Sequence, residues 1–179
     1  RPELKAMKLI DGRETMVACI QGLDGELRGA TRVNELTSLL IETLKPGIAA
    51  AIDRFGAGRV AVVIGTSNSG VDEGVRHLRT RLATGEWPEN YHYERQEMAD
   101  PARFAGSLIG AGGPVYALST ACTSGAKAIA TAARMLQTGL ADAVLCGGVD
   151  TLCDLTLNGF ASLESISPTP CNPFSLNRN

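Results

Sequence analysis

One cysteine of this 179-residue chain has neighbours that could give it chemistry. Cys122 lies in the segment Ser119-Thr120-Ala121-Cys122-Thr123-Ser124-Gly125-Ala126, between an apolar run and an alanine-rich run. The apolar run predicts a buried strand and the alanine-rich run predicts a helix, so Cys122 is expected at a strand-to-helix junction. The N-terminus of a helix stabilises a thiolate and lowers its pKa, and a sharp turn there presents the sulfur.

Two roles stay open for Cys122 on its position alone. As a nucleophile, its thiolate would attack a thioester, and its own backbone N–H would point towards the developing oxyanion. As a structural residue it would be a small buried hydrophobe, as most free cysteines are. Cys19, Cys146, Cys153 and Cys171 lack this setting, and the last three are interpreted as structural.

The sequence around Cys122 predicts an α/β fold with a mostly parallel sheet, because apolar β-branched runs alternate with segments that have the apolar periodicity of helices. Helices are predicted over residues 33–55, 71–82, 101–109 and 122–137 and from about residue 154, and strands over residues 59–66, 114–118 and 142–147. The run RVAVVIGT at 59–66 is typical of a strand buried on both faces. Lys45-Pro46 predicts a kink or break in the first helix, and Gly56 its end.

Other segments are less regular. Residues 1–30 carry little pattern, apart from a short strand over 15–21 and a glycine-rich turn that follows it. Residues 84–100 hold the only tryptophan and are interpreted as an inserted surface or interface segment. Asp100 is expected to be the N-cap of the next helix, with Pro101 as its first residue.

The composition fits one globular domain over residues 1–179, with 44% hydrophobic and 20% charged residues. A net charge of −2 and only 4% aromatic residues argue against nucleic-acid binding. Five cysteines without a CxxC pair predict neither a zinc site nor a disulfide framework, and reduced thiols favour a cytoplasmic protein. No apolar run is long enough to span a membrane.

The segment from Ser119 to Asp150 resembles the active-site region of β-ketoacyl-acyl carrier protein synthases, which have the thiolase-like fold. The family pattern there is a Thr-Ala-Cys turn, a Ser-Gly-Ala helix start and a later strand that ends in Gly-Gly. The matching residues are Thr120-Ala121-Cys122, Ser124-Gly125-Ala126 and Gly147-Gly148, flanked by Val63-Ile64-Gly65-Thr66, by residues 158–163 with Ser167, and by Pro173-Phe174 with Arg178. These blocks follow in order over residues 55–179, and the chain is identified as the N-terminal half of such an enzyme.

The resemblance implies a thiolase-like N-terminal half with helices on both faces of the sheet, and a decarboxylative Claisen condensation. Cys122 would be the nucleophile and backbone oxyanion donor, Thr120 and Ala121 would contact substrate, and Phe160 would gate the acyl pocket. The implied partners are acyl carrier protein, acyl and malonyl thioesters, and a second copy paired through strand 114–118. No cofactor or metal is implied.

The family also uses two histidines and a lysine from its C-terminal half to assist decarboxylation. His77 and His92 are the only histidines here, and neither matches those positions. These 179 residues alone are therefore expected not to catalyse condensation.

Four other functions were weighed. Residues 65–70 follow a strand but lack the GxGxxG spacing of a dinucleotide site. An α/β-hydrolase needs glycine two residues before and after its nucleophile, where Thr120 and Ser124 stand. A degradative thiolase has different residues around its cysteine. A non-catalytic partner subunit would have lost the cysteine, whereas an inert fragment stays open, as does the choice between a fatty-acid and a polyketide or polyene pathway.

Overall fold

The apolar run over residues 59–66 forms the central strand of a parallel sheet. This strand is β3, Val60–Gly65, and all of its residues are buried. It pairs on one side with β4 (Val115–Leu118) and on the other with β5 (Ala143–Gly148), both in parallel. The three predicted strands and their parallel pairing are confirmed.

The structure is a computed structural model that describes residues 2–20 and 31–178. By their contacts they divide into two compact units, one of residues 2–20 with residues 152–178 and one of residues 31–151. The parallel sheet and Cys122 belong to the second unit. Among the described residues, no helix combines the length and the hydropathy that crossing a membrane requires.

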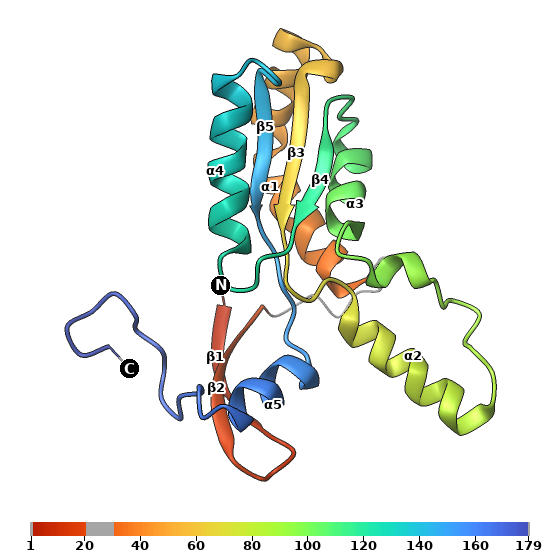
Figure 1. The fold of residues 1–179 in the computed structure, drawn as a ribbon, viewed down its shortest axis with the longest axis vertical. Helices are drawn as coiled ribbons and strands as arrows, with labels where there is room; N and C mark the ends of the chain where they lie inside the picture. Colours follow the sequence, from red (N-terminus) through yellow and green to blue (C-terminus); the bar gives the residue numbers. More distant parts are fainter. Residues whose placement is uncertain (1, 21–30, 179) are drawn as a thin grey trace. The chain divides into compact units, whose positions relative to one another are not determined.

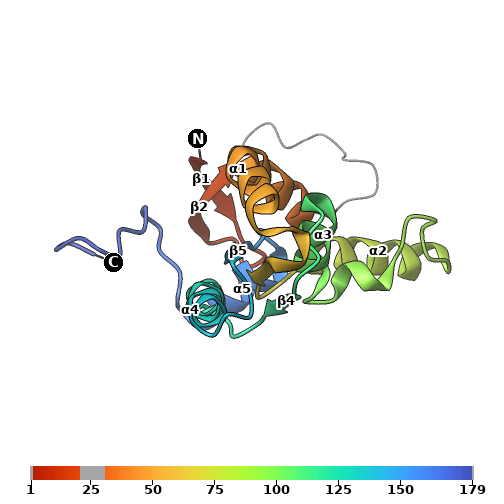
Figure 2. The same cartoon turned by 90° about the horizontal axis from the view of Figure 1, so that it is seen from above.

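Helices cover both faces of the sheet, as predicted (Figures 1 and 2). α1 (Arg32–Phe55) and α3 (Asp100–Ile109) pack on one face, and α4 (Ser124–Gln137) packs on the other. The side chains of β3 alternate between the two layers because successive residues of a strand point to opposite faces. Val62 and Ile64 pack with α1 and α3, whereas Ala61 and Val63 pack with α4.

Two expectations about helix geometry need correction. Of the kink or break predicted at Lys45-Pro46, the break is absent: α1 continues from Arg32 to Phe55 with Pro46 inside it, because proline removes only one backbone hydrogen bond from a long helix that also packs on the sheet. Asp100 is not an N-cap, since the cap of α3 is Ala99. The Asp100 carboxylate instead accepts a hydrogen bond of 2.7 Å from Nδ2 of Asn34, and burial raises the pKa of this carboxyl.

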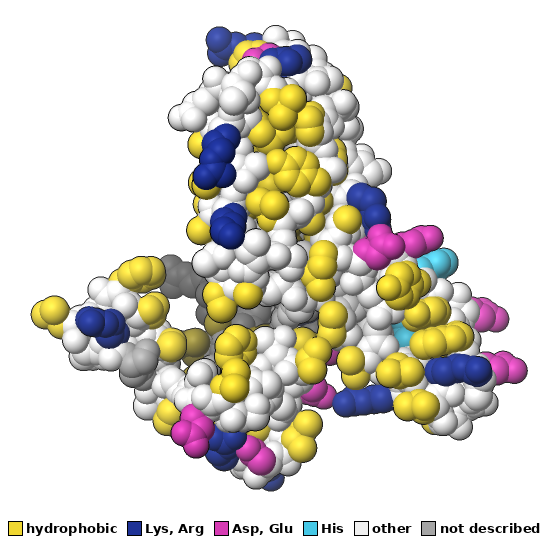
Figure 3. Space-filling view, viewed as in Figure 1, with side chains coloured by type: hydrophobic (Ala, Val, Ile, Leu, Met, Phe, Trp, Pro, Cys, Tyr) yellow, Lys and Arg dark blue, Asp and Glu magenta, His cyan; other side chains and the backbone are white. Residues whose placement is uncertain are grey.

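The segment after β3 extends away from the sheet in both ribbon views. It begins with α2 (Val71–Thr84), continues through η2 (Tyr93–Gln96) and ends at α3. The Trp87 ring stacks on Tyr91 at a centroid distance of 4.0 Å, and His77 meets Tyr91 edge-on at 5.7 Å. Hydrophobic side chains lie beside charged ones on its surface (Figure 3). The predicted surface segment over residues 84–100 therefore continues a projecting helix.

The other unit is built on a hairpin and one helix. β1 (Pro2–Lys8) pairs antiparallel with β2 (Glu14–Ile20), and α5 is Asp154–Ser162. Sequence analysis predicted β2 but missed β1, where charged and apolar residues mix without a clear period. The glycine-rich turn predicted after residue 21 lies outside the described residues.

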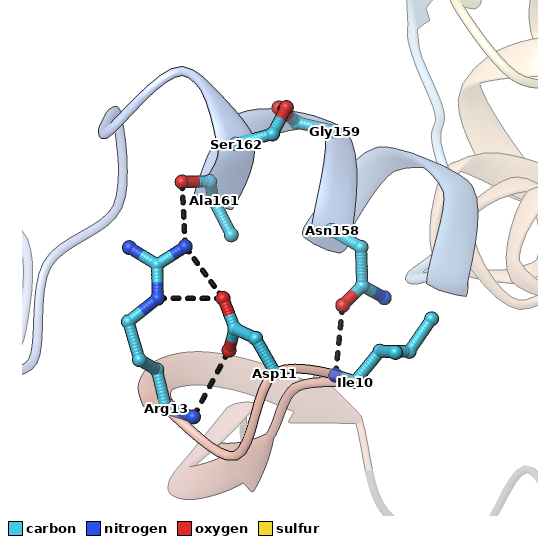
Figure 4. A network of polar contacts seen from close by, with 7 residues as sticks. All are labelled: Ile10, Asp11, Arg13, Asn158, Gly159, Ala161 and Ser162. Carbon is cyan, nitrogen blue, oxygen red and sulfur yellow. Dashed lines mark hydrogen bonds and ion pairs between the residues drawn. The ribbon is translucent and has the colours of Figure 1, made fainter.

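A polar network joins the hairpin turn to α5 (Figure 4). The backbone N–H of Ile10 donates to Oδ1 of Asn158 at 2.9 Å. Arg13 donates from Nε to Asp11 at 2.7 Å and from its terminal nitrogen to the Ala161 carbonyl at 2.8 Å. The hydrogen bond from Arg13 lowers the pKa of the Asp11 carboxyl. Polar contacts of this unit thus hold the segment that carries Phe160.

Candidate active site

Cys122 lies on a sharp turn between the end of β4 and the start of α4. Its side chain is exposed, and it precedes the first residue of α4, Ser124, by two positions. The helix was expected to begin at about Cys122, and it begins later because the hydroxyl-bearing residues of the turn bond to one another. No acidic residue stands in the first turn of α4, so no carboxylate there opposes a negative charge at its N-terminus.

Two hydroxyl groups close this turn. Oγ of Ser124 accepts from the Thr120 backbone N–H at 2.9 Å and donates to the Ala121 carbonyl at 2.6 Å. Oγ1 of Thr123 donates to the Thr120 carbonyl at 2.8 Å. Within the turn Ala121 has φ 52°, a left-handed conformation that costs a residue with a side chain about 1–2 kcal/mol. The hydrogen bonds offset that cost and hold Cys122 at the surface.

Three glycines allow the start of α4 to touch the sheet. A Cβ built on Gly65, the last residue of β3, would overlap the carbonyl carbon of Ser124 and would lie 2.7 Å from the Gly125 nitrogen. A Cβ on Gly148, at the end of β5, would lie 3.0 Å from the Gly125 Cα. The first turn of α4 therefore rests on bare backbone at the carboxyl ends of two strands, where sites of α/β proteins form.

The carboxylate of Asp150 ties the two strand ends together, and sequence analysis missed it. It accepts from Oγ1 of Thr66 at 2.8 Å, from the Ser67 backbone N–H and hydroxyl at 2.7 Å each, and from the Asn68 backbone N–H at 3.2 Å. Asn68 in turn donates from its side chain to the Thr151 carbonyl. An acidic residue two positions after a strand that ends in Gly-Gly, together with a Thr-Ser-Asn turn after another strand, is the sequence signal that could have revealed it.

The predicted site residues fall into both units. Cys122, Thr120 and Ala121 lie together in the turn of the sheet-containing unit. Phe160 lies on α5 of the other unit, with 43% of its side chain exposed.

The remaining cysteines differ from Cys122 in their surroundings. Burial raises the pKa of the Cys146 thiol in β5, and Cys153 is buried, which agrees with their interpretation as structural residues. Cys171 is exposed, so burial gives no support to its interpretation as a structural residue. It lies in the irregular segment that follows α5. Over residues 2–20 and 31–178, no group of three or more histidine, cysteine or acidic side chains could hold a metal ion.

The comparison with family models places this turn in a known domain. Residues 21–179 match the model described as β-ketoacyl synthase, N-terminal domain. Nodulation protein E of Rhizobium meliloti is 26% identical over 178 residues, which cover 98% of this chain and 44% of that protein. 3-Oxoacyl-[acyl-carrier-protein] synthase 2 of Synechocystis sp. is 38% identical over 71 residues, which cover 39% of this chain and 17% of that protein.

Solved structures show the same fold. A chain in the structure of the Xenorhabdus doucetiae ketosynthase ApeO in complex with its chain length factor ApeC is similar, with a TM-score of 0.82 and 37% identity, over 98% of this chain and 46% of the solved one. A β-ketoacyl synthase from Burkholderia phymatum has a TM-score of 0.71 at 23% identity, over 97% and 48%. The chain spans about half the length of these relatives. It belongs to the β-ketoacyl synthase family, whose N-terminal domain it matches from residue 21 to residue 179.

Proposed function

We propose that this chain carries the nucleophile of an enzyme that condenses an acyl thioester with malonyl-acyl carrier protein. The observation that carries the proposal is the exposed Cys122, held on a strained turn directly before α4 in a chain of the β-ketoacyl synthase family. The carboxyl ends of β3 and β5 pack against the first residues of α4, which follow this turn. The condensation needs a positioned thiolate and a hydrogen-bond donor for the oxyanion. The turn offers the sulfur of Cys122 for the first role and its backbone N–H for the second.

The reaction proceeds through a covalent intermediate on Cys122. The thiolate attacks the carbonyl carbon of the acyl thioester, a new C–S bond forms, and the sulfur of the carrier leaves as a thiolate, which takes a proton from solvent. The malonyl thioester then loses CO₂, and the electron pair of the broken C–C bond attacks the Cys122-bound acyl carbon. The Cys122 sulfur leaves as thiolate, and the product is a β-ketoacyl thioester on the carrier. Neither step needs an oxidant or a reductant. The backbone N–H of Cys122 stabilises the oxyanion of each tetrahedral intermediate.

The other predicted residues have supporting roles in this proposal. Thr120 and Ala121 shape the turn and border the bound thioester, and the ring of Phe160 gates the acyl chain. The groups that assist decarboxylation come from the other half of the complete enzyme, of which these 179 residues form the N-terminal domain. The similarity to solved ketosynthases supports this, because the chain covers only 46% and 48% of two such structures. The free cysteines among the described residues favour a reducing compartment, and hence the cytoplasm.

Covalent labelling tests the proposal. The complete protein is treated with cerulenin, an inhibitor that alkylates the nucleophilic cysteine of condensing enzymes, and each cysteine peptide is quantified by mass spectrometry. We expect one adduct, on Cys122, and protection of Cys122 by prior loading with an acyl thioester. Cys171 is the internal control, because it is also exposed but follows no strand-to-helix turn. Equal labelling of Cys122 and Cys171, without protection, contradicts the proposal.

A second subunit of the same fold is the proposed partner, and β4 is the proposed contact. In the part of the chain that the structure describes, β4 is an edge strand that pairs with β3 alone. The carbonyls of Pro114 and Leu118 bond to β3, so by alternation the backbone groups of Val115 and Ala117 face the other edge. An apolar edge strand needs a partner or a cover. The similarity to a ketosynthase solved with its chain length factor supports a partner of this kind.

Replacing Ala117 by proline is expected to convert the dimer of the complete protein into a monomer. Proline removes an outward N–H and leaves the hydrogen bonds to β3 in place. Light scattering on the purified protein measures the mass of the assembly. Ala117→Gly is the control, because it also changes the side chain at this position but keeps the N–H. A dimer of unchanged stability in Ala117→Pro would exclude pairing through β4.

A further inference from the structure

The side chain of Ser124 occupies a central position in the turn that carries Cys122. Only 3% of this residue is exposed, although it is the first residue of a surface helix. Its hydroxyl has one acceptor and one donor partner, both inside the turn, namely the Thr120 N–H at 2.9 Å and the Ala121 carbonyl at 2.6 Å. The backbone N–H of Ser124 also donates to the Ala121 carbonyl, at 3.0 Å. One residue therefore bonds to both residues that precede Cys122.

Ser124 holds the backbone of Ala121 in a conformation that alanine rarely adopts. Ala121 has φ 52°, and its carbonyl receives two of the three hydrogen bonds that Ser124 makes to the turn. Thr123 also bonds to the turn, but it is exposed, so water competes for its partners. A buried hydroxyl lacks that competition, and its loss leaves the Thr120 N–H without its partner. The strained conformation of Ala121 depends more on Ser124 than on Thr123.

The backbone of Ser124 is in turn fixed to the sheet. A Cβ on Gly65 would overlap its carbonyl carbon and would lie 2.5 Å from its carbonyl oxygen, so Ser124 has no room to move towards β3. The hydroxyl of Ser124 therefore fixes Thr120 and Ala121 relative to the sheet. Those two residues set where the Cys122 sulfur and backbone N–H lie relative to the N-terminus of α4.

We propose that Ser124 is a positioning residue for the nucleophile: its buried hydroxyl holds Ala121 in the left-handed conformation and keeps the sulfur and the backbone N–H of Cys122 in place before the first turn of α4. This inference rests on the proposed role of Cys122. Without the hydroxyl, the turn relaxes, and the sulfur and the backbone N–H move away from the position that the turn gives them.

Alkylation of Cys122 by iodoacetamide at pH 7 tests the proposal in the complete protein. Iodoacetamide reacts with any accessible thiolate, so this readout does not require the enzyme to catalyse condensation. In Ser124→Ala we expect the rate constant for Cys122 to fall about threefold to tenfold, because the turn no longer holds the sulfur in place. Ser124→Thr keeps the hydroxyl and is expected to restore the rate constant of the unmodified protein.

A change in the backbone provides the second test. In the double variant Ala121→Gly/Ser124→Ala, glycine adopts the positive φ without strain, so most of the lost reactivity of Cys122 should return. If Ser124→Ala does not fold, the double variant still decides the matter: recovery of folding and of Cys122 reactivity supports the positioning role, and a double variant that also fails to fold overturns it. Thr131→Ala is the matched control, since it removes a hydroxyl from α4 two turns beyond the site and should change nothing.

The possible outcomes separate this proposal from the proposed function. An unchanged rate constant for Cys122 in folded Ser124→Ala, or an equal fall in Thr131→Ala, overturns the positioning role. A Cys122 that reacts with iodoacetamide as expected but takes up neither cerulenin nor an acyl group overturns the proposed function and leaves the role of Ser124 standing.

Discussion

Replacing Cys122 by alanine in the complete protein is expected to lower the rate of condensation by at least about a thousandfold, because no covalent acyl intermediate can then form. The side chain is exposed, so its truncation leaves no cavity in the core and should leave thermal unfolding almost unchanged. Formation of β-ketoacyl carrier from an acyl thioester and malonyl carrier measures the rate. Intact-protein mass spectrometry measures the acyl adduct, which should disappear.

Cys171→Ala supplies the comparison, because it also removes an exposed thiol. This variant should keep both the acyl adduct and the rate. Cys122→Ser separates chemistry from shape, since a hydroxyl of similar size is a far weaker nucleophile, and we expect no adduct on it either. Substantial condensation by Cys122→Ala, with the acyl group on another cysteine, would show that a different residue is the nucleophile.

Replacing Gly65 by alanine is expected to destabilise the fold and to disturb the Cys122 turn together. The added methyl group would meet the Ser124 carbonyl carbon and lie 2.7 Å from the Gly125 nitrogen, and backbone atoms cannot rotate out of its way as a side chain could. Either α4 or β3 must shift. Overpacking of this kind costs about 1–3 kcal/mol in the free energy of unfolding. Urea unfolding measures that cost, and the rate of alkylation at Cys122, expected to fall, measures the movement of the turn.

Gly147→Ala is the matched control for Gly65→Ala. Gly147 also lies in the parallel sheet, pairs with Ile64 of the same central strand, and has nothing within 4 Å of a Cβ. Neither glycine has a positive φ, so alanine strains the backbone at neither position and the two variants differ in the contact alone. Equal stability of the two variants would mean that α4 does not rest on β3 at Gly65.

Much of the sheet-containing unit could be predicted from sequence patterns. The β-branched run of β3 requires burial on both faces, and the alternation of such runs with helical periods leaves few arrangements other than a parallel sheet. The location of Cys122 between β4 and α4 followed from the same patterns. These features are local in the sequence, or follow from the period of apolar residues.

What could not be predicted depends on contacts between distant residues. The capping role expected of Asp100 gives way to its hydrogen bond with Asn34, far away in the sequence. The hydrogen bonds from residues 66–68 to the Asp150 carboxylate likewise join residues that lie far apart in the sequence. The left-handed conformation of Ala121 runs against the preference of alanine, and it arises from a hydroxyl and from glycine contacts that only the folded chain brings together.

The ring stack beyond α2 has a spectroscopic consequence. Trp87 is the only tryptophan of the chain, so fluorescence excited at its absorption edge comes from this segment and from nowhere else in the 179 residues. Its indole lies 4.0 Å from the Tyr91 ring and is 44% exposed, which makes its emission sensitive to any surface that covers it. A wavelength shift on mixing with a carrier protein or a second subunit would therefore report contact at this projecting segment without an added label.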